Sequence, residues 1–476
     1  MNIKQLRQTI LGRAIRGQLV SQDPTDEPAS VLLERIRAEK EELIKEKKLK
    51  REKRDSQPIE EVPFEIPEGW VWCRLGDISL INPKNNLNDE LDVSFIPMSL
   101  ISEGFSNVHT SEVKKWKNIK ERYTHFCNED IGIAKITPCF ENRKSVIFNN
   151  LKNGVGAGTT ELYILRNNKT ISFNKYLFWV VKTQEFINKG IESFTGAVGQ
   201  QRVSKDFIEN TLIPLPPLAE QHRIVQKIEQ LFALVDIIEV NKKALEKLIE
   251  QAKSQVLSDA VAGKLTHQDP NDEPAEELLK RIGKTTAPDT PYEKLPKGWA
   301  WCRLGDLTEF IRNGISIKQN KGLKGYPITR IETISEGSIN RERMGYADIY
   351  DLSKYEQYLL TKGDILLSHI NSPIHIGKSA VYTPISDEEK IIHGMNLLCI
   401  RLKEVDSCFI NYFFNSKTFR YSLFPFIKHA VNQASINIGN LRNIYIPLPP
   451  LAEQHRIVQQ IEMYFAAFDK IKNELI

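Results

Sequence analysis

The sequence has no long apolar run, few cysteines and little net charge. No segment approaches the roughly 18 apolar residues of a membrane-spanning helix, and the amphipathic N-terminus lacks the apolar core of a signal peptide. The six cysteines among 476 residues form no CxxC pair, so we expect reduced thiols in a cytoplasmic protein. The formal net charge of +4 permits nucleic-acid binding without requiring it, because binding depends on where the charge lies.

Signatures of catalysis are also lacking. The "GKS" of 377–379 has Ser372 where a phosphate-binding loop needs glycine, so we expect no such loop. The "GVGAG" of 154–158 is a weak dinucleotide signal, and we expect a turn or recognition loop there. No Cys, His or carboxylate cluster has metal-site spacing, and no Asn-Pro-Pro-aromatic segment of amino-methyltransferases is present. We therefore predict no catalytic residue and no metal site.

What the sequence does contain is a repeat. The segment "IPLPPLAEQHRIVQKIE" at 213–229 returns at 446–462 with only Lys227 changed, to Gln460. The central copy continues without a break, whereas the other copy is split between the two chain ends. This order predicts an approximate twofold axis with the termini close together. Three further matches join "GWVWCRLGDIS" from Gly69 with "GWAWCRLGDLT" from Gly298, "GQLVSQDPTDEPASVLLERI" from Gly17 with "GKLTHQDPNDEPAEELLKRI" from Gly263, and, more weakly, 131–148 with 365–382.

The repeat also predicts long helices. Apolar residues follow a heptad-like spacing over 224–256, and the same phase runs through 457–475 and then 3–14, so we expect two long antiparallel helices. A helix over 224–256 rises roughly 48 Å. Gly263 should end it, and a short helix should follow from Asp272 to Ile282. In the N-terminal copy this short helix continues into a highly charged segment, 39–54, which is either a solvated helix or linker or a phosphate-contacting arm.

Between the helices lie two lobes, in which short β-branched and aromatic runs alternate with turn signals. Each lobe ends in a helical pattern, at 173–190 and 407–424, so we expect α/β lobes with a mixed, largely antiparallel sheet. The tryptophans of the repeated Gly-Trp-x-Trp segments, Trp70, Trp72, Trp299 and Trp301, are predicted core anchors. The resulting parts are an N-terminal conserved helical segment (1–60), lobe 1 (61–212), a central conserved long helix and linker (213–290), lobe 2 (291–445) and a C-terminal conserved helix packing with the N-terminal segment (446–476).

Each lobe carries two polar stretches, at 135–145 and 196–204 in lobe 1 and at 369–379 and 429–437 in lobe 2. Lys and Arg bind phosphates, Asn and Gln can bind adenine, and Arg can bind guanine. Composition alone favours solvated loops, whereas their occurrence at equivalent places in both lobes favours DNA recognition, and both readings stay open. Asn432 belongs to the last stretch. The candidate DNA-contacting residues are Lys135, Thr137, Asn142, Arg143, Lys144, Gln200, Gln201, Arg202, His369, Asn371, Ser372, His375, Lys378, Gln433, Ser435 and Asn437.

The duplicated "PLPPLAEQHRIV", with "GKLTHQDPNDEPAEELL" and the "GWxWCRLGD" pair, resembles the specificity subunit of type I restriction–modification systems over essentially the whole chain. The resemblance implies two target recognition domains, each reading half of a bipartite DNA site, and conserved helices that dock two methyltransferase subunits. It also implies endonuclease/translocase subunits, with S-adenosylmethionine, ATP and Mg on the partner subunits and no cofactor in this chain. The candidate partner-contacting residues are Leu218, His222, Arg223, Leu451, His455 and Arg456.

Two other functional classes remain open from the residues alone. A stand-alone DNA-processing enzyme, such as a nuclease, would show metal-dependent activity from this chain by itself. A coiled-coil scaffold whose lobes bind proteins would lack salt-sensitive, sequence-selective binding of duplex DNA.

Overall fold

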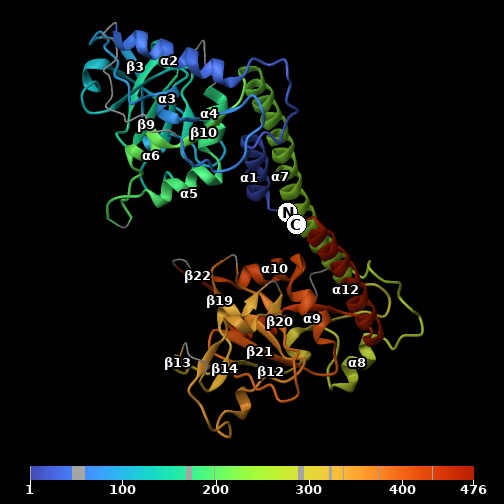
Figure 1. Cartoon of the computed structure of the whole chain (residues 1–476). Helices are drawn as coiled ribbons and strands as arrows, with labels where there is room; N and C mark the ends of the chain where they lie inside the picture. Colours follow the sequence, from blue (N-terminus) through green and yellow to red (C-terminus); the bar gives the residue numbers. More distant parts are fainter. Residues whose placement is uncertain are drawn as a thin grey trace. The chain divides into compact units, whose positions relative to one another are not determined.

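The fold consists of two compact units, Met1–Asn241 and Lys242–Ile476, each holding one lobe and part of the repeated helical segments (Figure 1). A computed structural model describes residues 2–45, 59–167, 174–197, 199–287, 294–320, 324–335, 337–373, 375–430 and 433–475. The mixed α/β lobes and the internal repeat that the sequence predicts are confirmed. The twofold axis, the nearness of the termini and the five-part division stay predictions.

Lobe 1 is built on two four-stranded sheets. The first is wholly antiparallel, and the second has one parallel pair, β3 with β8, so the predicted largely antiparallel character is confirmed. The first sheet has the order β2 (Leu80–Ile81), β9 (Leu162–Arg166), β6 (Ile131–Ala134), β7 (Ser145–Ile147). The second has the order β4 (Glu112–Lys115), β3 (Asp92–Ile96), β8 (Val155–Gly158), β5 (Thr124–Cys127).

The glycine-rich segment after Asn153 forms strand β8, so the expected turn or recognition loop is wrong. A Cβ atom at Gly158 would lie 2.1 Å from the carbonyl oxygen of Ile96, and one at Gly156 would lie 2.7 Å from that of Ser94. Neighbouring backbone therefore approaches too closely for a side chain, and this close packing explains the glycines.

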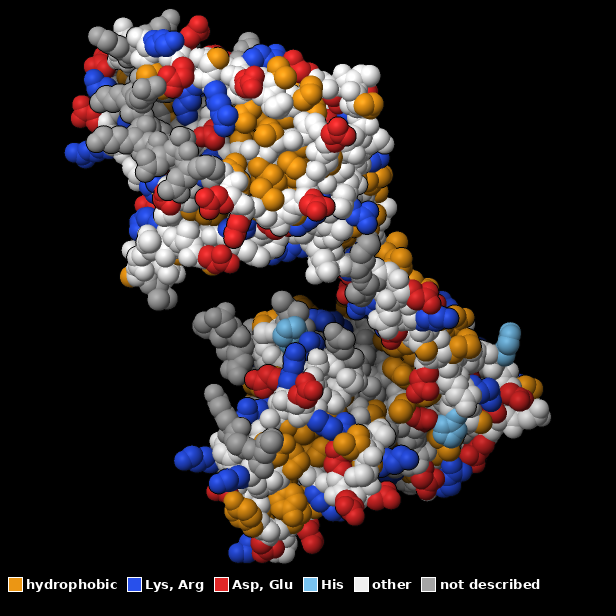
Figure 2. Space-filling view, in the orientation of Figure 1, with side chains coloured by type: hydrophobic (Ala, Val, Ile, Leu, Met, Phe, Trp, Pro, Cys, Tyr) orange, Lys and Arg blue, Asp and Glu red, His pale blue; other side chains and the backbone are white. Residues whose placement is uncertain are grey.

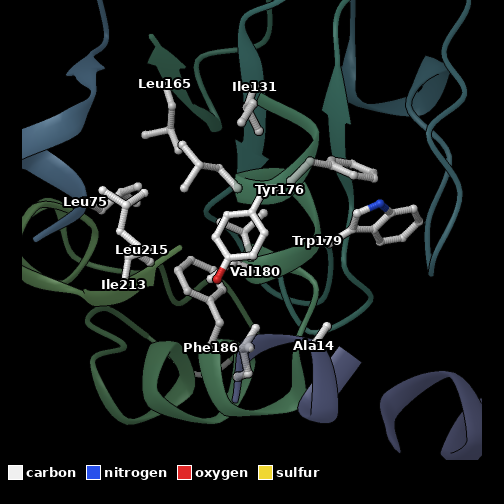
Figure 3. Close-up of a cluster of buried hydrophobic side chains, with 14 of the residues drawn as sticks. Ala14, Leu75, Ile131, Leu165, Tyr176, Trp179, Val180, Phe186, Ile213 and Leu215 are labelled. Carbon is white, nitrogen blue, oxygen red and sulfur yellow. The ribbon is translucent and has the colours of Figure 1, made fainter. Parts of the chain in front are cut away.

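One core cluster of unit 1 joins the first sheet to helices from three parts of the chain. Figure 3 shows Tyr176 of α4 (Asn174–Val181) at the centre of this cluster, and its hydroxyl donates to the carbonyl of Pro214 at 2.5 Å. The helix predicted over 173–190 is two helices, because the Thr183 side chain caps the start of α5 (Gln184–Glu192). The other helices of unit 1 that accompany them are α1 (Ile3–Ile15), α2 (Ala29–Lys45), α3 (Leu75–Ile78) and α6 (Lys205–Asn210).

Lobe 2 has a four-stranded antiparallel sheet of order β12-β21-β18-β20 and a three-stranded sheet of order β19-β23-β22. The helix predicted over 407–424 is again two helices, capped at Asp406 and Ser416. The strands are β12 (Thr308–Asn313), β21 (Leu397–Leu402), β18 (Ile365–Ser368), β20 (Ser379–Val381), β19 (Ile370–Asn371), β23 (Gln433–Ser435) and β22 (Lys428–Ala430), with β13 (Gln319–Asn320), β17 (Gly345–Ala347), β14 (Tyr326–Ile328), β15 (Ile334–Ser335) and β16 (Ser338–Ile339) in smaller sheets. The helices of unit 2 include α8 (Ala275–Arg281), α9 (Ser407–Phe414), α10 (Lys417–Leu423), α11 (Ile438–Arg442) and α12 (Leu451–Glu474).

The long central helix α7 (Leu218–Val261) spans 44 residues and ends two residues before Gly263, as predicted. In unit 1 its first half lies antiparallel to α1, where Arg7 pairs with Asp236 at 2.5 Å. In unit 2 its second half lies antiparallel to α12, where Lys253 pairs with Asp469 at 2.6 Å. These two ion pairs occupy equivalent positions of the repeat, so the repeat extends to the contacts of the long helices within each unit, and the continuation of the helical phase across the chain ends stays a prediction.

The predicted apolar seam of α7 is partly buried. Ile224, Ile228, Val235 and Ile249 are buried, whereas Ile238 is exposed. The charged N-terminal segment is helical to Lys45, the end of α2, and the rest of 39–54 lies outside the described residues. None of the described helices combines the length and apolar character that a membrane crossing requires.

Candidate nucleic-acid interface

Each lobe meets its long helix at a junction, which we define by residues 213–225 in unit 1 and 446–458 in unit 2. In unit 1 the strand β10 (Leu212–Leu215) pairs with β1 (Val71–Arg74) and then leads into α7. At the start of α7 the buried Glu220 carboxylate accepts a bond from the Trp70 indole nitrogen at 2.9 Å and another from the Gln22 amide at 3.0 Å. Burial raises the pKa of Glu220. One carboxylate therefore binds all three repeated blocks together.

The junction of unit 2 repeats these contacts, where β11 (Ala300–Arg303) pairs with β24 (Tyr445–Leu448). Glu453 accepts from the Trp299 indole nitrogen at 2.9 Å and from the Gln268 amide at 3.1 Å. Trp70 and Trp299 are buried, as predicted, whereas Trp72 and Trp301 are half-buried. The near-identity of the two segments thus has a structural cause, since the bonds of Glu220 to Trp70 and Gln22 recur at Glu453 with Trp299 and Gln268.

The candidate partner-contacting residues lie at these junctions. Arg223 pairs with Asp26 at 2.6 Å, and Arg456 pairs with Asp272 at 2.5 Å, so both guanidinium groups have partners within their own unit. Leu218 and Leu451 are half-buried against the hydrophobic cores. His222 and His455 are exposed, and a His455 ring nitrogen lies 3.5 Å from an Asp406 carboxylate oxygen. Contact of any of these six residues with another subunit stays a prediction.

The backbone brings the two polar stretches of lobe 1 side by side. The amide of Thr137 donates to the carbonyl of Gln201 at 3.0 Å, and the amide of Val203 donates to that of Lys135 at 2.8 Å. Residues more than 60 positions apart along the chain therefore form one surface. The sequence predicted both stretches but not that they pair.

The side chains of this surface differ in how exposed they are and in whether they have partners within the lobe. Gln200 and Asn142 are exposed, and Asn142 contacts a Glu103 carboxylate oxygen at 3.3 Å. Arg202 makes a two-pronged ion pair with Glu161, at 2.9 and 3.0 Å. The remaining candidates are half-buried: Lys135, whose ammonium lies 5.3 Å from the Tyr163 ring centre, Lys144, which donates to the Met98 carbonyl at 3.3 Å, Thr137 and Gln201.

Arg143 is placed differently from the prediction. Its side chain is 4% exposed, and its guanidinium donates to the Lys182 carbonyl at 3.2 Å and to Gln184 at 2.5 Å. Burial lowers the pKa of Arg143. The adjacent Lys182 ammonium donates to the carbonyls of Gly104, Ser106 and Arg143 itself at 2.8 to 2.9 Å, and burial lowers its pKa to about 7. The assignment of Arg143 to DNA is therefore corrected: it fixes the loop from inside.

Lobe 2 joins its two polar stretches through the same pairing. Ile370 of β19 is opposite Ser435 of β23, and the amide of Ile436 donates to the His369 carbonyl at 3.0 Å. These positions match Ile136, Arg202, Val203 and Lys135 of lobe 1. The backbone arrangement is therefore repeated although the side chains are not.

The candidate side chains of lobe 2 also fall into classes. His375, Lys378 and Asn437 are exposed, and Asn437 caps α11 by accepting from the Asn440 amide at 2.7 Å. Asn371, Ser372 and Ser435 are half-buried. His369 is buried, and burial lowers the pKa of its ring, so its assignment to DNA contact is corrected. The backbone of Gln433 belongs to β23, and Asn432 lies outside the described residues.

Two groups of residues near these loops escaped the sequence reasoning. Glu161 and Lys182 make contacts that no local sequence pattern predicts, because their partners, Arg202 and Arg143, lie far away along the chain. Tyr421 and Phe424 are exposed aromatic residues next to the loops of lobe 2, within the segment that was predicted only to be helical. The lack of acidic residues from Ser407 through Ala452 was the available signal for this second group.

Comparison with known proteins accounts for both the repeat and the lobes. The family described as "Type I restriction modification DNA specificity domain" matches residues 67–247 and again 296–476. The specificity subunit of the type I restriction enzyme EcoAI of Escherichia coli is 38% identical, over 99% of this chain and 90% of that protein. The EcoEI specificity subunit of Escherichia coli is 35% identical, over 99% and 91%.

Solved structures share the fold at lower sequence identity. The HsdS subunit from Thermoanaerobacter tengcongensis has a TM-score of 0.57 at 22% identity, covering 87% of this chain and 95% of its own. A chain from work on complex assembly and conformational transition of the type I R-M system has a TM-score of 0.61 at 21% identity, covering 87% and 96%. The chain therefore belongs to the family of type I restriction–modification specificity subunits, and its two lobes are its target recognition domains.

Proposed function

We propose that each lobe reads one half of a bipartite DNA site through its paired polar loops, while the two junctions and their helices dock two copies of one methyltransferase subunit. One contrast carries the proposal. The loops share a backbone arrangement but differ in side chains, whereas the junctions are nearly identical in sequence and repeat the Trp–Glu bond and the Arg–Asp ion pair. Different side chains suit different base sequences, and equal surfaces suit two copies of one partner.

Within each lobe we assign the exposed polar residues to DNA. Gln200 and Asn142 in lobe 1 have amide groups able to pair with adenine, and His375 and Asn437 offer polar contacts in lobe 2. Lys144 and Lys378 are assigned to phosphates, because an ammonium group binds a phosphate without regard to sequence. Arg202 reads a base only if it exchanges its Glu161 partner, so we assign it to positioning of the loop.

Exposed apolar residues on the long helices support the docking proposal. In unit 1, Leu234, Ile237 and Val240 of α7 are more than half exposed, at 56%, 56% and 64%. In unit 2, Met463 of α12 is 56% exposed. Figure 2 shows hydrophobic side chains at the surface where Figure 1 draws α7 and α12. Such residues suit a protein partner.

The rest of the complex follows from this assignment. We propose that the chain itself is non-catalytic and carries no cofactor, and that S-adenosylmethionine, ATP and Mg are bound by the methyltransferase and endonuclease/translocase subunits. The expected cytoplasmic location stays a prediction.

Exchange of one lobe tests the proposal. The chain is expressed with its methyltransferase partner, and methylated adenines are mapped across a genome, first with the native chain and then with lobe 1 replaced by that of a relative. We expect a split motif with a fixed gap, and a change in one half only after the exchange. A continuous motif, or a change in both halves, would contradict the proposal.

The two other classes are tested with the purified chain and with its complex. DNA cleavage that needs a divalent metal, by the chain alone, would identify a stand-alone enzyme. Absence of salt-sensitive, sequence-selective duplex binding by the complex would identify a scaffold.

A further inference from the structure

An aromatic turn of lobe 2 is exposed to solvent. The rings of Tyr421, Phe424 and Phe426 are 77%, 68% and 36% exposed, at the end of α10 and in the following 3-10 turn, Phe424–Phe426. Between them, Leu423 is buried, as is Phe419 one turn earlier. The turn is therefore anchored from below, and its exposed rings are held at the surface by packed neighbours. Adjacent exposed aromatic residues of this kind mark interaction sites.

The aromatic turn adjoins the polar loops of the same lobe. It leads through Ile427 directly into β22, where Lys428 lies opposite Ser435 of β23. The same Ser435 lies opposite Ile370 of β19, so one short sheet links the turn to both polar stretches. Figure 1 shows α10, β19 and β22 gathered in one part of lobe 2.

The charge of this segment suits an anionic partner. No Asp or Glu occurs from Ser407 through Ala452, whereas Lys417, Arg420, Lys428 and Arg442 lie within it. Lys417 and Arg420 of α10 and Lys428 of β22 are exposed. A basic stretch without carboxylates, beside exposed rings, favours nucleic acid as the partner of this surface over an ordinary solvent-facing role.

We propose that Phe424, supported by Tyr421, inserts against base faces and unstacks one base step in the half-site that lobe 2 reads. This inference rests on the proposed function. A phenyl ring offers no hydrogen bond to phosphates or base edges, and the large apolar surfaces of duplex DNA are its base faces. Proteins reach these surfaces by wedging apolar side chains between base steps, and the neighbouring cations supply the attraction to phosphates.

Lobe 1 lacks the aromatic turn. By the repeat, Phe424 and Phe426 correspond to Ile191 and Ser193, and Pro425 corresponds to Glu192. The two rings are thus replaced by an aliphatic side chain and a hydroxyl group, and the proline is replaced by a carboxylate. The unstacking is therefore confined to the lobe 2 half-site, and the lobe 1 half-site serves as an internal control.

The experiment uses the full chain without methyltransferase subunits, because methyltransferases extrude bases themselves. A duplex target is selected from a randomised 40-base-pair library, and thymine unstacking is measured by permanganate reactivity. We expect enhanced reactivity in one half-site only, loss of it in Phe424→Ala, and affinity weakened on the order of 10-fold. Phe424→Trp keeps a stacking ring and should retain both properties. Tyr350→Ala, at another ring of lobe 2 that is 74% exposed, should change neither.

The outcomes separate the two proposals. If no sequence is selected, the proposed function fails. If a sequence is selected but its bases stay stacked, or both half-sites unstack alike, only the proposed insertion of Phe424 between bases is wrong. Phe424→Ala could instead keep duplex binding and unstacking but no longer assemble with the methyltransferase subunit. The aromatic turn would then be a protein contact, and the proposed insertion of Phe424 would likewise be wrong.

Discussion

The indole nitrogen of Trp70 donates to the buried carboxylate of Glu220 at 2.9 Å, although the two residues lie 150 positions apart. Trp299 and Glu453 repeat this bond at 2.9 Å in the second unit. This bond explains why the repeated sequence blocks are similar in both units, because each block supplies one partner of the same buried carboxylate group. The segment after Ile213 is therefore a structural junction with internal partners.

Replacing the buried carboxylate by its amide tests this role. In Glu220→Gln one carboxylate oxygen becomes an NH2 group that faces a donor, from either Trp70 or Gln22. We expect the free energy of unfolding to fall by ~1–3 kcal/mol, measured by denaturant titration. Glu453→Gln should cost a similar amount.

The double mutant serves as the check on independence. The two carboxylates lie in different compact units and share no partner, so their costs should add. Glu250→Gln, at an exposed position of α7, should leave stability unchanged. A neutral Glu220→Gln would show that the bonds to this carboxylate contribute little.

Two substitutions in lobe 1 separate base reading from phosphate binding. Gln200→Ala should relax one base position by ~1–3 kcal/mol, because an amide that reads a base edge is removed. Lys144→Ala should weaken binding across all sequences and reduce the salt dependence. Binding to a panel of single-base target variants measures both. Wild-type affinity and target choice in both variants would remove these residues from the interface.

The buried Lys182 predicts a packing effect without a change in target. In Lys182→Met three backbone carbonyls, those of Gly104, Ser106 and Arg143, lose their donor. We expect a loss of ~2–4 kcal/mol in the free energy of unfolding, since the half-buried carbonyls of Gly104 and Ser106 lose this donor, while the carbonyl of Arg143 still accepts from the Ser145 amide. Lys189→Met, on the exposed face of α5, is the matched control and should cost little. Equal effects of the two would contradict the role of Lys182.

His393 in lobe 2 predicts a pH dependence. Burial lowers the pKa of its ring from 6.5 to about 4. Between these two values the unfolded chain binds a proton that the folded chain does not, so stability falls as the pH drops through this window. At pH 5 the contribution of this ring is a loss of ~2 kcal/mol relative to pH 7. His393→Gln should remove this part of the pH dependence in calorimetry, whereas exposed His375→Gln should preserve it.

The sequence was most informative where residues repeat. Spacing of apolar residues predicted α7, because a helix places every third or fourth residue on one face whatever surrounds it. Gly263 and Pro274 marked helix ends by local backbone chemistry. The β-branched runs predicted strands such as β9 and β21 for the same local reason.

It was least informative about burial of single polar residues. Arg143 and His369 lie in polar stretches and have side chains suited to DNA, yet both are buried. Their surroundings come from residues distant along the chain, Lys182 in the case of Arg143. The glycines of β8 led to the wrong prediction of a turn or recognition loop for a related reason. The close approach of β3 requires these glycines, and the sequence does not show which strand is adjacent.

The sequence by itself thus determined the repeat, the helices and the location of the variable polar stretches, since these depend on periodicity and on local backbone preference. Only the tertiary structure decided that the paired stretches form one surface in each lobe, that Glu220 and Glu453 join three distant blocks, and that Tyr421 and Phe424 stay exposed. Those outcomes depend on which distant groups become neighbours, and packing of the whole lobe decides that.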